Sequence, residues 1–137
     1  MQFSAKWGAK VRDYECDIQG IVNNSVYQNY LEHARHEMLM EMAINFADLA
    51  YKGINLVVIR AEIDYRSPLK SGDSFWVGSN LKQVSKLKFA FSQQIFRVQD
   101  EKLVVNAQIY GAALNSVGKP MVLTELNEAI ATLHNQE

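Results

Sequence analysis

The feature that most constrains the fold is a single long helical stretch, followed by a chain that reads almost entirely as strands. No proline or glycine occurs between residues 21 and 52. Inside this stretch, apolar residues recur at the spacing of one helix face: Tyr27, Tyr30, Leu31, Ala34, Met38 and Met42. We expect a helix that begins near Ser25, with Ser25 or Asn24 as its N-cap. It should end or bend near residues 44–45, and a shorter helix should cover residues 46–52.

Strand patterns dominate the remainder of the chain. Five segments show the alternation, or the β-branched and aromatic content, of strands: residues 3–12, 56–65, 74–84, 87–98 and 103–114. A short C-terminal helix is expected over residues 124–133. One long helix followed by a meander of strands predicts an α+β fold, in which an antiparallel sheet of about five strands packs on the helix. The helix cannot also cover an exposed sheet edge, so we expect a homo-oligomer, either a dimer or a tetramer.

Composition excludes several classes of protein. The 137 residues predict one domain, residues 1–137, and 48% hydrophobic with 21% charged residues is typical of a globular protein. A net charge of -1 argues against a nucleic-acid partner and gives no membrane signal. The single cysteine excludes an intramolecular disulfide and a cysteine-based metal cluster. The N-terminal residues lack the apolar core of a signal peptide, so the expected location is cytoplasmic.

Asp17 is the candidate catalytic residue. It precedes a turn that leads into the long helix, and a helix N-terminus offers unpaired backbone N–H groups and a partial positive charge. A carboxylate beside such an anion-stabilising terminus is what acyl transfer requires. The alternative interpretation is structural, because aspartate near glycine is common in turns, where its side chain binds local N–H groups.

The stretch around Asp17 also carries a family signature. The matching residues are Arg12, Glu15, Asp17, Gly20, Ile21, Val22, Tyr27, Glu32, Ala34 and Arg35. With them the chain resembles the 4-hydroxybenzoyl-CoA thioesterase-like family of hotdog-fold enzymes. Cys16 replaces the usual threonine, and Asn23-Asn24 stand where many members have histidine or tyrosine pairs. The resemblance implies the hotdog fold, in which the sheet wraps the helix, and a dimer or tetramer.

The resemblance further implies an acyl-CoA thioesterase, acting on coenzyme A or acyl-carrier-protein esters, with Asp17 as general base or nucleophile. Coenzyme A would be part of the substrate, and no metal or redox cofactor is implied. The backbone N–H groups expected to polarise the thioester carbonyl are those of Asn23, Asn24 and Ser25. The residues expected to bind the substrate are Gly20, Val22, Val26, Tyr27, Ser67, Pro68, Lys86 and Lys88. In this set Lys86 and Lys88 would bind the phosphates, although a solvated hairpin explains them equally.

Several alternatives stay open. Glu32 is the second-rank catalytic candidate, because another branch of hotdog thioesterases uses a helix glutamate; on the polar face it could instead pair with Arg35 or His36. The chain could also be a non-catalytic hotdog protein that binds acyl groups or coenzyme A. A hotdog hydratase would need a histidine partner, and no histidine occurs between Glu37 and His134. The sequence contains no Gly-x-Ser-x-Gly motif, which disfavours an α/β-hydrolase.

Overall fold

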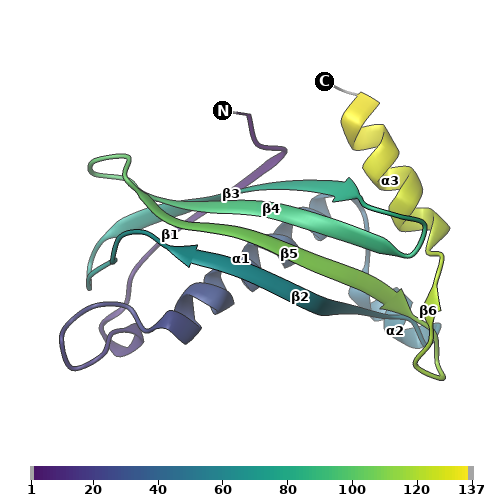
Figure 1. Ribbon diagram of the computed structural model, residues 1–137, viewed down its shortest axis with the longest axis horizontal. Helices are drawn as coiled ribbons and strands as arrows, with labels where there is room; N and C mark the ends of the chain where they lie inside the picture. Colours follow the sequence, from purple (N-terminus) through teal and green to yellow (C-terminus); the bar gives the residue numbers. More distant parts are fainter. Residues whose placement is uncertain (1, 136–137) are drawn as a thin grey trace.

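The computed structural model describes residues 2–135, and Figure 1 shows their arrangement. In chain order the elements are β1 (Ala5–Lys10), the single-turn 3-10 helix η1 (Asp13–Glu15), α1 (Asn24–Glu41), α2 (Phe46–Tyr51), β2 (Asn55–Tyr65), β3 (Ser74–Gln83), β4 (Lys88–Arg97), β5 (Leu103–Leu114), β6 (Pro120–Met121) and α3 (Thr124–Asn135). The predicted order of a strand, one long helix and then four long strands is therefore confirmed. The predicted meander holds only for β3, β4 and β5, because β2 pairs with β5 and not with β3.

The strands form one antiparallel sheet in the order β1-β3-β4-β5-β2, with the two-residue β6 paired to β5. The view in Figure 1 looks at the outer face of this sheet, and α1 lies behind it. Alternate residues of each strand point towards α1, as the period of two requires. Phe75, Val77 and Leu81 of β3 are each at most 1% exposed, and Leu31 and Met38 of α1 pack in the same core.

Helix α1 buries the apolar stripe that its periodicity predicts. Its buried residues are Tyr27, Tyr30, Leu31, Ala34, Met38 and Leu39. The predicted cap is wrong by one residue, because the N-cap is Asn23 and its side chain makes no capping hydrogen bond. The helix also ends earlier than expected, at Glu41. After α2, Gly53 ends the turn with a positive φ of 75° and donates its N–H to Ala50 O, as a glycine at this position should.

Strand β2 is a long edge strand of the sheet, and its outer side has no partner strand within the described residues. It has 11 residues and binds only β5 within the described chain. Val58 and Ile59 on this edge are 53% and 47% exposed. From Arg60 onward its outward residues carry charges, and Arg60 pairs with Glu62 at 3.0 Å while Arg66 pairs with Asp64 at 3.7 Å. The edge thus combines free backbone groups, apolar side chains and ordered charges.

No helix among residues 2–135 is long and apolar enough to cross a membrane.

Candidate functional site

Asp17 is held in a tight loop between η1 and α1. Its N–H donates to Ile21 O at 2.8 Å, and its own carbonyl accepts from Gly20 N at 2.9 Å. Gly20 has a φ of 83°, a conformation that favours glycine, so the loop requires this residue. The carboxylate atom Oδ1 accepts hydrogen bonds from the N–H groups of Gln19 at 2.9 Å and Ile21 at 3.3 Å. Within the described residues Oδ2 accepts none, so one oxygen is anchored and the other is available.

Buried Glu15 anchors this loop to helix α1. Glu15 is only 9% exposed, and its carboxylate accepts a hydrogen bond from the Tyr30 hydroxyl at 2.7 Å. It also accepts from Arg12, through the backbone N–H at 2.8 Å and through Nη1 at 3.2 Å. Burial, followed by the hydrogen bond to Glu15, raises the pKa of Tyr30, so this phenol remains a donor. The network fixes where the Asp17 loop begins relative to α1.

Two backbone donors at the start of α1 are free. The N–H of Asn23 donates to Glu15 O at 3.1 Å, which makes it unavailable and corrects the expectation that it polarises a carbonyl. Asn24 and Ser25 are the first two helical residues, so the helix supplies no acceptor for their N–H groups. No other acceptor for them is found among residues 2–135. The N-terminus of α1, which the Asn23–Glu15 bond ties to the chain two residues before Asp17, therefore offers two donors.

A groove runs from this terminus along α1. One cavity, of about 360 Å³, is lined by Ser25, Gln28, Asn29 and Glu32 of α1 and by Ala61 and Ile63 of β2. A second, of about 390 Å³, lies further along, and its lining includes Leu39, Phe46, Leu56, Phe89 and Phe91. Both cavities are also lined by Glu32, Arg35, Val58 and Ile109, so they lie next to each other along α1, and together they are here called the α1–β2 groove. The groove leads from the free donors to an apolar pocket.

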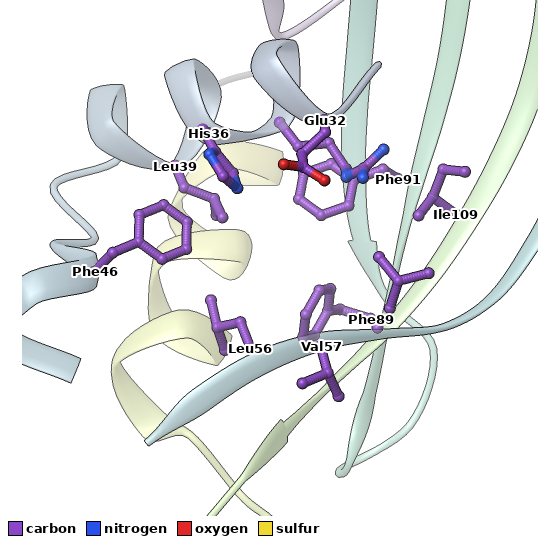
Figure 2. Close-up of a pocket in the computed structure, with 12 residues that line it drawn as sticks. Glu32, His36, Leu39, Phe46, Leu56, Val57, Phe89, Phe91 and Ile109 are labelled. Atoms are coloured by element: carbon purple, nitrogen blue, oxygen red, sulfur yellow. The ribbon is translucent and has the colours of Figure 1, made fainter. Parts of the chain in front are cut away.

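Figure 2 shows how this pocket is built. Glu32, His36 and Leu39 enter it from α1, and Phe89, Phe91 and Ile109 enter it from the sheet. The His36 ring packs on Phe46, with ring centroids 4.8 Å apart. Glu32 was expected on the polar helix face, where it does lie exposed, and this part of the face borders the groove. His33, by contrast, pairs with Glu37 at 3.2 Å and packs on Trp7, away from the pocket.

The substrate-binding residues expected near Asp17 divide between core and surface. Val22 and Tyr27 are 2% and 3% exposed and form part of the core, and neither lines the groove. The Tyr27 hydroxyl accepts from Leu69 N at 2.9 Å, and Leu69 O accepts from Val22 N at 2.9 Å. These bonds bring the Ser67-Pro68 segment, which precedes Leu69, to the same end of the molecule. Val26 is partly buried and packs against the core.

Lys86 and Lys88 lie at the opposite end of the sheet. Val11 N donates to Asp73 O, and Ile21 pairs with Lys70, so the Asp17 loop sits at the start of β3. Lys86 lies in the turn that follows β3, and Lys88 is the first residue of β4, so both are at the end of the sheet where β3 finishes (Figure 1). Ten strand residues separate the ends, a span of roughly 30 Å. A single chain therefore does not bring these lysines to its own Asp17.

Cys16 and metal chemistry add little to the site. Burial, followed by the charges of Asp13, Asp17 and Glu15, raises the pKa of the Cys16 thiol, which disfavours the nucleophilic thiolate. No cluster of three or more His, Cys, Asp or Glu side chains suited to a metal is found among the described residues.

Sequence reasoning missed a buried polar network beside the groove. Gln93 of β4 is 0% exposed and donates through Nε2 to Leu31 O at 3.1 Å and to Ser79 Oγ at 3.0 Å. Its Oε1 accepts from Arg35 Nη1 at 3.1 Å. A signal was present, because Gln93 falls in phase with the apolar residues Phe91 and Ile95 of the same strand. The burial of Glu15 was also missed, because the charged residues around it in the sequence are exposed.

Comparison with known proteins agrees with this arrangement. The family model of the Thioesterase-like superfamily matches residues 11–125. The acyl-acyl carrier protein thioesterase ATL3 of Arabidopsis thaliana is 36% identical over 112 residues, which cover 82% of this chain and 59% of that protein. The chain thus spans about three fifths of the length of that relative. The long-chain acyl-CoA thioesterase FadM of Escherichia coli is 33% identical over 100 residues, 73% of this chain and 75% of FadM.

A solved structure extends the comparison to the fold. The 1,4-dihydroxy-2-naphthoyl-CoA thioesterase Slr0204 of Synechocystis superposes with a TM-score of 0.88, covering 95% of this chain and 97% of that one. At 20% sequence identity this likeness concerns the fold alone. The family model, by contrast, matches the Asp17 loop, α1, the four long strands β2 to β5 and the short β6. The chain therefore belongs to the thioesterase-like superfamily and has the hotdog fold.

Proposed function

We propose that this chain hydrolyses the thioester bond of acyl-CoA or acyl-carrier-protein substrates, with Asp17 as general base or nucleophile. The observation that carries the proposal is the half-anchored Asp17 carboxylate, whose Oδ1 accepts two backbone hydrogen bonds while Oδ2 accepts none within residues 2–135. Glu15, two residues before Asp17, accepts from Asn23 N, and this bond ties the start of α1, with the N–H groups of Asn24 and Ser25, to the same loop. The names of the relatives, thioesterases of acyl-carrier-protein and long-chain acyl-CoA esters, support the same reaction.

The proposed reaction uses these groups in two ways. As a general base, Asp17 takes a proton from water while the water oxygen bonds to the thioester carbon. As a nucleophile, an Asp17 oxygen bonds to that carbon itself, and water then hydrolyses the mixed anhydride. In both cases the carbonyl oxygen becomes an oxyanion that the N–H groups of Asn24 and Ser25 stabilise. In the general-base route the oxyanion collapses, the carbon–sulfur bond breaks, and the leaving thiolate takes the proton held by Asp17, which frees the carboxylic acid. In the nucleophile route the same collapse expels the thiolate, which takes a proton from solvent, and leaves the mixed anhydride, whose hydrolysis frees the carboxylic acid and Asp17.

The groove supplies the place for the acyl group. It begins at Ser25, one of the two proposed oxyanion donors, and continues to the apolar pocket around Phe46 and Phe89. An acyl chain bound there would have its carbonyl at the Ser25 end and would bury its methylene groups, each worth about 0.8 kcal/mol. Val26, which packs against the core, and the buried residues Val22 and Tyr27 would support this path from the core.

We also propose that the working form is a homo-oligomer, at least a dimer, joined through the β2 edge. The exposed apolar residues and free backbone groups of β2 support this pairing. A second copy would explain how Lys86 and Lys88 contact phosphates of a substrate whose carbonyl lies roughly 30 Å away in the same chain. Sedimentation at micromolar concentration tests the assembly, and a clean monomer would contradict it.

The activity is tested by thiol release from a panel of aliphatic and aromatic acyl-CoA esters and acyl-carrier-protein esters. We expect release well above the uncatalysed rate for at least one class. Retention of binding without any thiol release would favour the acyl-binding alternative. Wild-type chain and an Asp17→Asn variant should be assayed side by side, because a contaminating esterase would act equally in both preparations.

A further inference from the structure

The apolar part of the α1–β2 groove ends at one aromatic side chain, that of Phe89 in β4. Phe89 lines the cavity of about 390 Å³ together with Leu39 and Leu56, and its side chain projects from the sheet into this cavity (Figure 2). It also lines a small void of about 10 Å³ beside the start of α3, and among the described residues it alone borders both spaces. Phe89 therefore lies between the groove and the void.

The ring of Phe89 has a fixed position. The residue is 7% exposed, and its ring stands nearly perpendicular to that of Phe91, with the two centroids 5.9 Å apart. The ring also lies against Gly111 of β5, where an added Cβ atom would be 2.5 Å from Cε2 and 2.6 Å from Cζ of the ring, and 3.1 Å from Val57 O. Any side chain at position 111 would therefore displace the ring.

The void behind Phe89 is lined mainly by apolar side chains. They come from the turn between β3 and β4, from β5, and from the residues around β6 and the start of α3: Leu87, Ala113, Met121, Leu123 and Leu126. At about 10 Å³ the void holds at most one water molecule, so it adds no length to the groove while the ring is in place. Without the ring, the groove and the void would form one continuous apolar space. Phe89 thus determines where the groove ends.

The walls before Phe89 suit an acyl chain. In the cavity next to Ser25, α1 contributes mostly polar side chains, whereas the sheet contributes apolar residues, Ala61 and Ile63 among them. An acyl chain would therefore lie along the sheet in this cavity. Its distal part would then enter the more apolar cavity that Phe89 closes.

The length of the groove sets the length of this chain. Along α1 the groove extends from Ser25 to Leu39, which in a helix is roughly 21 Å. Along β2 it extends from Ile63 back to Leu56, which in a strand is roughly 23 Å. Each carbon–carbon bond of about 1.5 Å advances a zigzag chain by about 1.3 Å, so the groove holds roughly sixteen carbons.

We propose that Phe89 is the end wall of the acyl site and limits the substrates to acyl chains of up to roughly sixteen carbons, with Gly111 as the residue that lets the ring take this position. This inference rests on the proposed thioesterase function, because it takes the groove as the acyl site. Chains shorter than the limit gain affinity with each methylene group that they bury. Chains beyond the limit meet the ring and gain no further affinity.

The experiment measures binding and hydrolysis over one series of chain lengths. Non-hydrolysable S-alkyl coenzyme A thioethers from octyl to eicosyl, kept below their micelle concentrations, are titrated by calorimetry, and kcat/KM is measured for the corresponding acyl-CoA esters. For the wild-type chain we expect the affinity to rise about fourfold for each added methylene group, the usual gain from burial. The rise should stop near a length of about sixteen carbons, where the chain fills the groove.

Two substitutions should move this limit in opposite directions. Phe89→Ala opens the groove to the void, so the limit should lengthen by roughly two carbons, the reach of the ring beyond its Cγ atom. Phe89→Leu should lengthen it by about one carbon, and it replaces Phe89→Ala if that variant does not fold. Gly111→Ala pushes the ring off the sheet into the groove, so the limit should shorten by about one carbon or more. A general loss of stability would not produce opposite shifts.

Phe96→Leu is the matched control for Phe89→Leu. Phe96 belongs to the same strand and is 6% exposed, but it stacks on Trp76 of β3, with centroids 4.7 Å apart, on the opposite face of the sheet. Its replacement removes the same atoms from a buried position outside the groove. The length limit should therefore stay where the wild-type chain has it.

The outcomes bear differently on the two proposals. Thiol release with a length limit that neither the Phe89 variants nor Gly111→Ala move overturns this inference and leaves the thioesterase function standing. An affinity that still rises at the eicosyl thioether in the wild-type chain also overturns it. Thioether binding whose limit moves as expected, without any thiol release from the esters, supports the inference while the proposed function fails.

Discussion

Replacement of Asp17 by asparagine separates a catalytic carboxylate from a structural one. Asparagine keeps the Oδ1 atom that accepts from Gln19 N at 2.9 Å and Ile21 N at 3.3 Å, so the loop should remain folded. What is lost is the charge. Hydrogen bonds to a charged acceptor contribute about 1.5 to 3 kcal/mol and neutral ones about 1 kcal/mol, and only the Gln19 bond is short. Because Asp17 is partly exposed, we expect a stability loss of about 1 kcal/mol.

The expected effect on catalysis is much larger. A stability loss of this size lowers the Tm of a chain this long by about 4 °C. The kcat for the best thioester should fall at least about a hundredfold, the usual scale of general-base catalysis, and further if Asp17 is the nucleophile. The assay measures steady-state thiol release next to a thermal melt for Asp17→Asn, with Glu32→Gln as the matched carboxylate control.

Two results would refute the reasoning. Near-normal kcat for Asp17→Asn combined with an inactive Glu32→Gln would move the catalytic carboxylate to the helix. Full activity in both variants would show that neither carboxylate is catalytic, and the assignment of this site would fail.

Three further predictions concern other parts of the molecule. Lys86→Ala combined with Lys88→Ala should raise KM more than it lowers kcat, because phosphate contacts far from the carbonyl bind the substrate and the transition state equally. The rise in KM should shrink at high salt, and an unchanged KM would mean that the two lysines only belong to a solvated hairpin. Tyr30→Phe should destabilise the fold by about 1.5 to 3 kcal/mol in denaturant unfolding, because it removes the 2.7 Å hydrogen bond to buried Glu15, and a loss below experimental error would contradict the anchoring role. The hydrogen bonds from Arg97 lower the pKa of Asp100 from 3.8 to about 2, so the ionised pair stabilises the fold above pH 3.8, and this contribution disappears as the pH falls through 2. Wild type and Asp100→Asn should therefore differ in Tm at neutral pH and converge in acid. A Tm difference that stays constant with pH would count against the pair.

The elements of this fold could be predicted from the sequence because each depends on local patterns. The stripe that includes Leu31 and Met38 determines the buried face of α1, and the alternation around Val77 determines the inner face of β3. The N-cap was misplaced because the position of Asn23 is set by a long-range bond from its N–H to Glu15 O. Cap chemistry alone does not reveal such a contact.

The site was less predictable because it depends on where distant segments meet. The Asp17 loop, Gly20 and the start of α1 are contiguous in sequence, and the structure brings the Ser67-Pro68 segment to them through Leu69. The distance to Lys86 and Lys88, however, follows from the direction of β3 in the sheet, which no local pattern encodes. The groove lining likewise combines α1, β2, β4 and β5, so Phe89 and Ile109 could be assigned to the core but not to a pocket.

The order of charges on β2 has a consequence for assembly. Two copies of this strand that pair antiparallel about a two-fold axis centred on Ala61 place Arg60 opposite Glu62 of the second copy, twice over. A shift that centres the axis on Ile63 sets Arg60 against Arg66 and Glu62 against Asp64, and like charges directly opposite each other are destabilising. The charges of this edge therefore discriminate between pairing registers, in addition to the pairing that its free backbone groups allow. In the proposed dimer these charges would favour one register between the copies, and with it one fixed spacing between their two grooves.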